Sequence, residues 1–491
     1  MSQDSPITPR ATDYSQWYLD VISAAGLADY SPVKGAMVIR PHGYAMWEHM
    51  RDDLDRRFKD TGHVNAYFPL FIPVSFLSKE AEHVEGFAKE CAVVTHHRLR
   101  AAKGGGVEPD PESKLEEPLV VRPTSETIIW HMYGQWIQSY RDLPILINQW
   151  ANVVRWEMKT RLFLRTSEFL WQEGHTAHAT SAEAMDEATK MLGVYTEFAR
   201  EILALPVIPG VKSASERFAG ALETFCIEAM MQNGWALQAG TSHFLGQNFA
   251  KAFDVTFQTQ EGTREHVWAT SWGVSTRLIG AVIMAHSDDT GLVLPPTIAP
   301  VQVVVTPIWK NDAEKADVMA FCEQVVAALK PTVRVKLDDR DMKPGAKYYE
   351  WERKGVPLRL EIGPRDVKQA SVFAAARTGG KKEGMPLEGL AQAVRAKLDT
   401  IQGELYTRAL ANQQARTFRP ETYAEMSAAL DGGGFFLVPW HDDATAEQKI
   451  KDETRATIRC YPIDAQAEAQ GRTCFYSGRP ATHMAIFARA Y

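Results

Sequence analysis

Residues 154–175, VRWEMKTRLFLRTSEFLWQEGH, constrain the fold more than any other part of this chain. The segment predicts two strands joined by a basic loop. Because side chains alternate along a strand, Arg155 and Glu157 should share one face of the first strand. One face of the second strand should present Phe169, Trp171, Glu173 and His175. A face of this composition gains little from burial in an apolar core.

A guanidinium, an aromatic plane and carboxylates on one sheet face suit the binding of a nucleotide. Arginine grips phosphate in a forked geometry, and a ring can stack on a base. The alternative is an ordinary amphipathic hairpin with a solvated polar face, which a short R-x-E pattern alone does not exclude. The rest of the chain favours binding.

The chain has 491 residues, too many for a single core, so two or three domains are expected. No apolar run is long enough to span a bilayer, and MSQDSPITPRATDYSQW lacks the pattern of a signal peptide. Five scattered cysteines suggest reduced thiols. We therefore expect a cytoplasmic protein without membrane association. The net charge of −7 argues against nonspecific nucleic-acid binding but allows a local basic surface for one RNA.

Periodicity gives a coarse map of the first 300 residues. Residues 43–58 have apolar residues at helical spacing, and a strand-like run, AYFPLFIP, follows at 66–73. The Gly-, Pro- and Glu-rich stretch at 101–118 predicts a mobile surface loop. A helix should begin at Thr180, with Glu183 as its capping partner, and stop at Pro206.

The Pro-rich segment LVLPPTIAP suggests a linker between domains, and the sequence pattern changes after it. Strands at 301–308, 333–338 and 356–363 alternate with helices that begin at Asn311 and near residue 387, which indicates an α/β domain. After Arg416 a small segment mixes a helix at 421–430 with short strands at 435–440, 457–461 and 483–487.

With these residues in view, the chain resembles a class II aminoacyl-tRNA synthetase, and more narrowly a prolyl-tRNA synthetase of the archaeal and eukaryotic type. The resemblance covers nearly the whole chain. Motif one matches the helix and strand at 43–73, motif two the hairpin described above, and motif three SWGVSTRLIGAVI, where Arg277 opens a helix. Three further segments narrow the choice: VRPTSE at 121–126, SERFAGA at 215–221 and GTSHFLGQNF at 240–249.

The resemblance implies an α+β fold with three domains. An antiparallel catalytic sheet with flanking helices would cover residues 1–290, an α/β anticodon-binding domain 300–408, and a small α/β C-terminal domain 416–491. The implied activity is that of a proline–tRNA ligase, which activates L-proline with ATP to prolyl-adenylate and transfers it to the 3′ end of proline tRNA. Motif one is a dimer interface in the family, so a homodimer is expected.

Activation is an in-line attack of the amino acid's carboxylate on the α-phosphate of ATP, which needs positioning and charge neutralisation. By resemblance, Arg155 and Arg277 are catalytic, with Arg155 at the α-phosphate and Arg277 and Arg165 at the γ-phosphate. Phe169 would stack on adenine, and Glu157 would accept a hydrogen bond from its amino group. Gln238, Thr241 and Ser275 would also contact the ATP, which enters as its Mg²⁺ complex.

Proline has a secondary ammonium with two N–H donors, which a carboxylate and a hydroxyl can accept. By resemblance, Thr124 and Glu126 bind this ammonium, although Thr124 could also cap the following helix. The positions implied around the ring and carboxylate are Arg155, Trp171, Glu173, His175, Phe218, His243 and Ser271. For Trp171 and Phe218, plain core packing is the alternative.

The strand VPLRLEIG at 356–363 could simply be half buried with a solvated face. By resemblance, however, Glu352, Arg359, Arg365 and Asp366 match positions that read the two guanines of proline anticodons, a task that suits Arg planes and polar edges. Family members often hold a structural zinc with four cysteines. Here only Cys474 stands at such a position, so we expect no zinc and no other protein metal site.

Two alternatives remain open. A synthetase for threonine, serine or glycine would share this catalytic fold, although the threonine enzyme would need a catalytic zinc held by Cys and His. A synthetase-like protein that has lost catalysis could serve as a binding subunit. The joint presence of Arg155, Arg165 and Arg277 argues against a catalytically dead relative.

Overall fold

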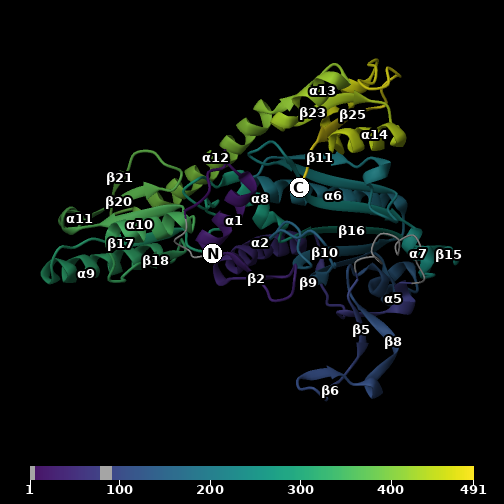
Figure 1. Ribbon diagram of the computed structural model, residues 1–491, viewed down its shortest axis with the longest axis horizontal. Helices are drawn as coiled ribbons and strands as arrows, with labels where there is room; N and C mark the ends of the chain where they lie inside the picture. Colours follow the sequence, from purple (N-terminus) through teal and green to yellow (C-terminus); the bar gives the residue numbers. More distant parts are fainter. Residues whose placement is uncertain (1–5, 78–90) are drawn as a thin grey trace.

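The computed structural model describes residues 6–77 and 91–491, and its centre is a sheet of eleven strands (Figure 1). In spatial order these are β22 (Thr417–Phe418), β23 (Phe435–Trp440), β25 (His483–Ala488), β24 (Thr457–Pro462), β11 (Val207–Val211), β12 (Glu223–Met230), β13 (Ala236–Gly246), β16 (Trp268–Ser275), β10 (Glu168–His178), β9 (Ile145–Val154) and β3 (Val64–Asn65). The pairs from β11 to β9 are antiparallel. The predicted antiparallel catalytic sheet is therefore confirmed, and the C-terminal region extends it.

Helices pack against both faces of this sheet. Those of the first 300 residues are α1 (Tyr14–Ala25), α2 (Pro41–Asp60), α3 (Val74–Leu77), α5 (Glu126–Trp136), α6 (Ser181–Glu201), α7 (Asn248–Ala252) and α8 (Arg277–His286). Buried residues of α1, α2, α6 and α8 share one core with Trp272 and Val274 of β16. Because side chains alternate along β16, Ser271, Gly273 and Ser275 point to the opposite face.

Helix α6 begins as predicted. The Thr180 hydroxyl accepts from the backbone N–H of Glu183, and the Glu183 carboxylate accepts from that of Thr180. The helix ends at Glu201, several residues before the predicted stop at Pro206. The strand predicted at 66–73 is mostly wrong, since only β4 (Phe71–Pro73) is regular there. The chain crosses between two sheets at this point, and the Phe68 N–H bonds to the Gln149 side chain instead of to a ladder.

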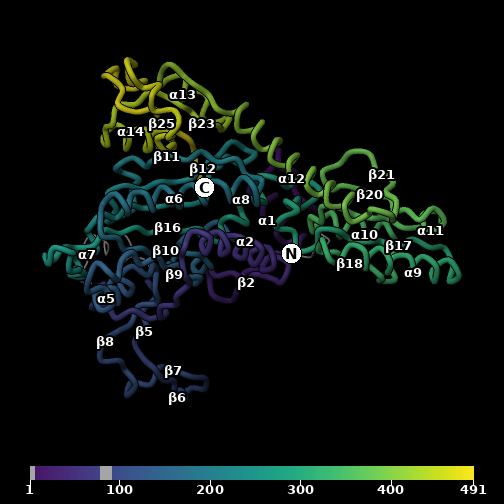
Figure 2. The backbone as a smooth tube through the Cα atoms, turned by 180° about the vertical axis from the view of Figure 1, so that it is seen from behind, coloured from purple at the N-terminus to yellow at the C-terminus, as the bar shows by residue number. Residues whose placement is uncertain are grey.

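The loop predicted at 101–118 is a ribbon instead. Its strands are β5 (Val93–His96), β6 (Leu99–Ala101), β7 (Val107–Pro109) and β8 (Lys114–Val121), and Figures 1 and 2 show it projecting from the body. Two cross-strand ion pairs support the ribbon, Arg98–Asp110 at 2.7 Å and Arg100–Glu108 at 2.8 Å. The sequence suggested a loop because polar pairs, and not apolar alternation, hold these strands together. Two small hairpin pairs complete this region: β1 (Ala28–Tyr30) with β2 (Met37–Ile39), and β14 (Thr256–Gln258) with β15 (Arg264–His266).

The second region is an α/β unit on a five-stranded sheet. In order its strands are β18 (Val335–Leu337), β17 (Val303–Pro307), β19 (Leu358–Ile362), β20 (Ser371–Ala376) and β21 (Glu383–Pro386). Its helices are α9 (Asp312–Leu329), α10 (Pro344–Arg353), α11 (Pro364–Gln369) and α12 (Leu390–Ala415). The predicted cap of α9 is confirmed, since Asn311 accepts from the Glu314 N–H. The sequence did not reveal α10, β20 or β21.

Helix α12 leads into the C-terminal region, which adds α13 (Tyr423–Ala429) and α14 (Ala444–Thr454). Strand β24 pairs with β11 and so joins this region to the catalytic sheet. A buried ion cluster lies at the junction: Lys212 Nζ is 2.7 Å and Arg459 Nη2 is 3.1 Å from Glu228 Oε1. The sheet is thus continuous across the two regions.

The α/β unit meets the catalytic region through a bidentate ion pair. Arg377 donates to both carboxylate oxygens of Asp288, at 2.8 and 2.7 Å, and its Nε donates to the backbone oxygen of Leu292. Among the helices of residues 6–77 and 91–491, none has the length and apolar character needed to cross a membrane.

Candidate active site

Three neighbouring strands, β10, β16 and β13, bring the predicted residues together by their register. The antiparallel pairing places them directly opposite one another in two cross-strand rows, His175–Ser271–His243 and Glu173–Gly273–Thr241. Gly273 has no side chain, so the middle of the second row stays open between a carboxylate and a hydroxyl. The polar face predicted for residues 169–175 is therefore the floor of a site.

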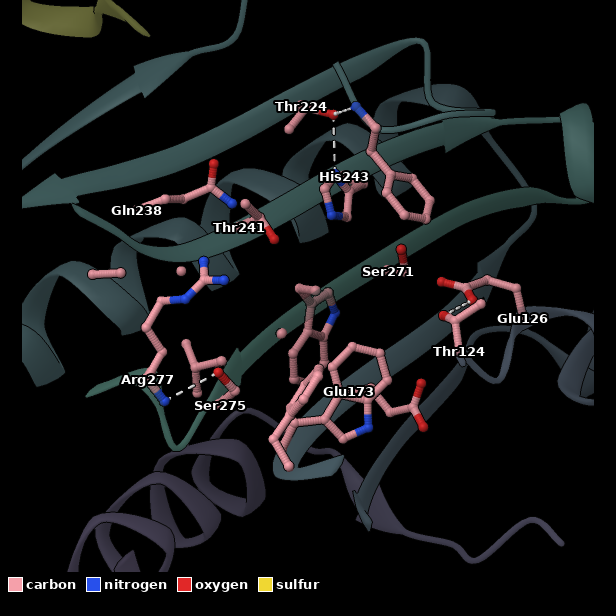
Figure 3. A pocket seen from close by; sticks show the side chains of 18 of the residues that line it. Thr124, Glu126, Glu173, Thr224, Gln238, Thr241, His243, Ser271, Ser275 and Arg277 are labelled. Atoms are coloured by element: carbon pink, nitrogen blue, oxygen red, sulfur yellow. Dashed lines mark hydrogen bonds between the residues drawn. The ribbon is translucent and has the colours of Figure 1, made fainter. Parts of the chain in front are cut away.

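A cavity of about 290 Å³ lies over this face (Figure 3). The predicted residues that line it are Thr124, Glu126, Arg155, Phe169, Trp171, Glu173, His175, Phe218, Gln238, Thr241, His243, Ser271, Ser275 and Arg277. Glu157 and Arg165 line an adjacent cavity of about 470 Å³, which shares Arg277 with the first. Trp171 and Phe218 both line the cavity, and Phe218 also packs against a hydrophobic cluster.

The loop between β9 and β10 carries Arg155 and Arg165. Arg155 and Glu157 are not on a strand, contrary to expectation, because β9 ends at Val154. The Arg155 Nε donates to the backbone oxygen of Pro123 at 3.0 Å, and its guanidinium lies 5.5 Å from the ring centres of Phe169 and Trp171. Glu157 and Arg165 form an ion pair of 2.5 Å.

The two ends of the cavity differ in charge. Figure 3 shows Arg277, Ser275 and Gln238 near one end and Thr124 and Glu126 at the other. Burial lowers the pKa of Arg277, and the charges of Arg155 and Arg165 lower it further. An anion at this end would relieve the repulsion among these cations, so it suits a polyphosphate.

The other end suits a small cation. The Thr124 hydroxyl donates to the Glu126 carboxylate, and both residues are buried. The alternative of Thr124 as a helix cap is wrong, because the N-cap of α5 is Ser125. A buried carboxylate with a neighbouring hydroxyl offers two acceptor groups to an ammonium.

Four residues that line the cavity have a buried polar atom without a hydrogen-bond partner in the part of the chain that the structure describes. The atoms are Trp171 Nε1, His175 Nδ1, Ser271 Oγ and Trp272 Nε1. Unpartnered buried polar groups are costly, so native proteins retain few of them without a reason. Three of these residues, Trp171, His175 and Ser271, are on the sheet face that carries the cavity.

Sequence reasoning missed Glu216, Thr224 and Gly273, which also line the cavity. Thr224 lies opposite His243, bonds to its Nδ1 at 3.0 Å, and accepts from the Phe218 N–H at 3.1 Å. Glu216 lies two residues before Phe218, within the SERFAGA segment quoted above, and this position could have been used to predict it. The place of Thr224 depends on the pairing of β12 with β13, which no local pattern reveals.

The four predicted anticodon residues lie close together in sequence around β19. Arg359 Nη1 is 2.9 Å from Glu352, and its guanidinium lies 3.9 Å from the ring centre of Tyr348. Asp366 accepts from the Gly363 N–H at the start of α11, and Arg365 beside it is exposed. Near Cys474, and throughout residues 6–77 and 91–491, no group of three His, Cys, Asp or Glu side chains could hold a metal.

An antiparallel sheet with a cavity and several arginines on one face is the arrangement expected of a class II aminoacyl-tRNA synthetase. Family models agree: the class II core domain (G, H, P, S and T) matches residues 108–286, the anticodon binding domain 302–397, and the prolyl-tRNA synthetase C-terminal domain 423–491. The chain belongs to the prolyl-tRNA synthetase family, and its activity is the ATP-dependent ligation of proline to tRNA.

Proline–tRNA ligases of Porphyromonas gingivalis and Bacteroides fragilis are each 57% identical to this chain, over 99% of both sequences. The Cryptosporidium parvum prolyl-tRNA synthetase complexed with halofuginone and AMPPNP has a TM-score of 0.91 at 38% identity, over 99% of each chain. Its complex with L-proline and AMP has a TM-score of 0.90 at 38% identity, over 99% of this chain and 96% of that one. The expected archaeal and eukaryotic type is not supported, because these 57% identical relatives are bacterial.

Proposed function

We propose that the cavity holds ATP at its cationic end and proline at the end formed by Thr124 and Glu126, with Arg155 serving both. The observation that supports this division is the difference in charge between the ends. Arg155 contacts Pro123, the neighbour of Thr124, and its charge also lowers the pKa of Arg277. It is therefore suited to neutralise both the attacking carboxylate and the α-phosphate.

On the nucleotide side, Arg277 and Arg165 hold the γ-phosphate, and Arg155 holds the α-phosphate. Phe169 stacks on adenine, and Glu157 accepts from the adenine amino group. Gln238, Thr241 and Ser275 supply the remaining polar contacts. The Cryptosporidium enzyme was solved with AMPPNP, which supports an ATP site in this chain, and Mg²⁺ enters bound to the phosphates.

On the amino-acid side, the ammonium of proline donates to Thr124 and Glu126. Its ring and carboxylate lie among Trp171, Glu173, His175, Phe218, His243 and Ser271. Phe218 stacks on His243, with ring centres 4.4 Å apart, and so closes one side of a space sized for a small ring. The complex of the Cryptosporidium enzyme with L-proline supports this assignment.

The finer features of the protein belong to the same proposal. The catalytic domain spans 1–290, the anticodon-binding domain 300–408 and the C-terminal domain 416–491, which folds without zinc. Glu352, Arg359, Arg365 and Asp366 read the anticodon of proline tRNA. The enzyme is a cytoplasmic homodimer that does not associate with membranes.

Proline-dependent exchange of pyrophosphate into ATP tests the assignment of Arg155. Replacing Arg155 with Ala removes the charge that neutralises the reacting groups, so kcat should fall by about a hundredfold or more while the fold is retained. Arg200→Ala is the matched control, since Arg200 is a surface arginine paired with Glu201. Retained exchange in the Arg155 variant would contradict its role.

The alternatives left open by the sequence are decided by the relatives: proteins that are 57% identical over 99% of this chain are proline–tRNA ligases, not synthetases for threonine, serine or glycine or binding subunits.

A further inference from the structure

Behind the cavity wall, Glu173 is held by two residues that do not line the cavity. Ser125 Oγ donates to Glu173 Oε1 at 2.5 Å, and Gln149 Nε2 donates to the same oxygen at 2.7 Å. Gln149 is directly opposite Glu173 in the β9–β10 register. Its own oxygen accepts from the Phe68 N–H, which fixes the amide orientation. Both Ser125 and Gln149 are fully buried.

The use of Ser125 is unusual for its position. A serine at a helix N-cap ordinarily accepts a hydrogen bond from a backbone N–H of the first turn. Within the described chain, Ser125 makes no such bond, although it is the N-cap of α5. Its hydroxyl is directed to Glu173 instead, so the helix forgoes a capping bond in favour of the carboxylate.

The second oxygen of Glu173 fixes His175. Glu173 Oε2 lies 2.9 Å from His175 Nε2, and because a carboxylate only accepts, Nε2 carries the hydrogen. The other ring nitrogen, Nδ1, is one of the buried atoms that have no hydrogen-bond partner in the described part of the chain. The groups that face His175 are Glu126 and Tyr133 from α5, Ser271 from β16 and Ile147 from β9. Of these, only Glu126 is charged.

We propose that Ser125 and Gln149 are positioning residues for proline activation: by holding Glu173, they fix the orientation of the His175 imidazole beside the proline site and favour its protonated form. Burial lowers the pKa of His175, but the hydrogen bond and charge of Glu173 and the charge of Glu126 outweigh it and raise the pKa overall. The protonated imidazole has a hydrogen on both nitrogens, so in that form Nδ1 is a donor as well. The proposal depends on the assignment of His175 to the proline site.

The test compares Ser125→Ala and Gln149→Met with Gln172→Met in proline-dependent pyrophosphate exchange. Gln172 is equally buried on the same strand as Glu173 but bonds to Asn148 and Tyr195, away from the cavity. Loss of a hydrogen bond to a charged group should raise KM for proline about tenfold in both test variants and leave KM for ATP unchanged. The alkaline limb of kcat/KM for proline should move to lower pH in these variants, because Glu173 supports the imidazolium less well.

The proposal fails if Ser125→Ala leaves KM for proline unchanged, if Gln172→Met raises it equally, or if the alkaline limb does not move. Ser125→Ala removes only a hydroxyl, so it decides the matter even if Gln149→Met does not fold. A wild-type enzyme without proline-dependent exchange would instead overturn the function itself.

Discussion

His178 and His286 lie inside the catalytic region, where burial lowers the pKa of each imidazole from 6.5 to about 4. His286 Nε2 lies 2.9 Å from the backbone oxygen of Leu203, and His178 Nε2 lies 2.8 Å from the Thr176 hydroxyl. Both side chains are therefore neutral parts of the folded protein at neutral pH. Their chemistry is set by burial, which the sequence around each histidine does not reveal.

These two histidines should make the folded state sensitive to acid. Between pH 6.5 and about 4 the unfolded chain binds protons that the folded chain does not, so the free energy of unfolding falls as the pH falls. The slope contributed by one such group is up to about 1.4 kcal/mol per pH unit. Urea unfolding of His286→Gln across this range should show a shallower slope than the wild type. An unchanged slope would mean that His286 binds a proton equally well in the folded and the unfolded protein, which would contradict the prediction.

At the scale of elements, the sequence predicted what depends on local periodicity and end signals. The shared face of Phe169, Trp171, Glu173 and His175 is present, as are the caps at Thr180 and Asn311. The sequence did not predict features that depend on contacts between distant segments of the chain. The ribbon at 93–121 depends on pairs such as Arg98–Asp110, and the support of Glu173 by Gln149 depends on a strand register. Neither is visible in a local pattern.

Two glycines give a matched test of packing behind the site. A Cβ at Gly174 would lie 2.2 Å from the ring of Trp272, which is directly opposite on β16. Gly174→Ala should therefore lower the free energy of unfolding by about 1–3 kcal/mol. Gly193 lies within α6, and apart from its chain neighbours and the backbone of its own helix no described atom is within 4 Å of a Cβ there. Gly193→Ala should raise stability by about 0.5–1 kcal/mol.

Urea denaturation midpoints of both alanine variants measure this difference. Similar midpoints for the two would show that Trp272 moves aside at little cost, and that the close packing of β10 on β16 is not needed.

At the scale of the whole molecule, the ion cluster of Lys212, Glu228 and Arg459 joins the catalytic and C-terminal regions. All three side chains are buried, so each charge depends on its partners. Removing Glu228 leaves two cations without their anion, whereas removing Arg459 leaves the Lys212–Glu228 pair intact. The two losses are therefore not equivalent.

Glu228→Gln should lower the free energy of unfolding by about 3–5 kcal/mol, the usual cost of an uncompensated buried charge. Arg459→Met should cost less, because a neutral pair remains. Thermal unfolding of both variants at one protein concentration gives the order. A larger loss for Arg459→Met would contradict the assignment of Glu228 as the central anion.

The continuity of the sheet across β24 and β11 also has a meaning for solubility. If the C-terminal strands were removed, β11 would become an exposed edge strand. Its unpaired N–H and C=O groups could then pair with a strand of another chain. The C-terminal strands therefore protect the edge of the catalytic sheet from pairing with other chains. We expect their removal to cause aggregation before any change in tRNA binding.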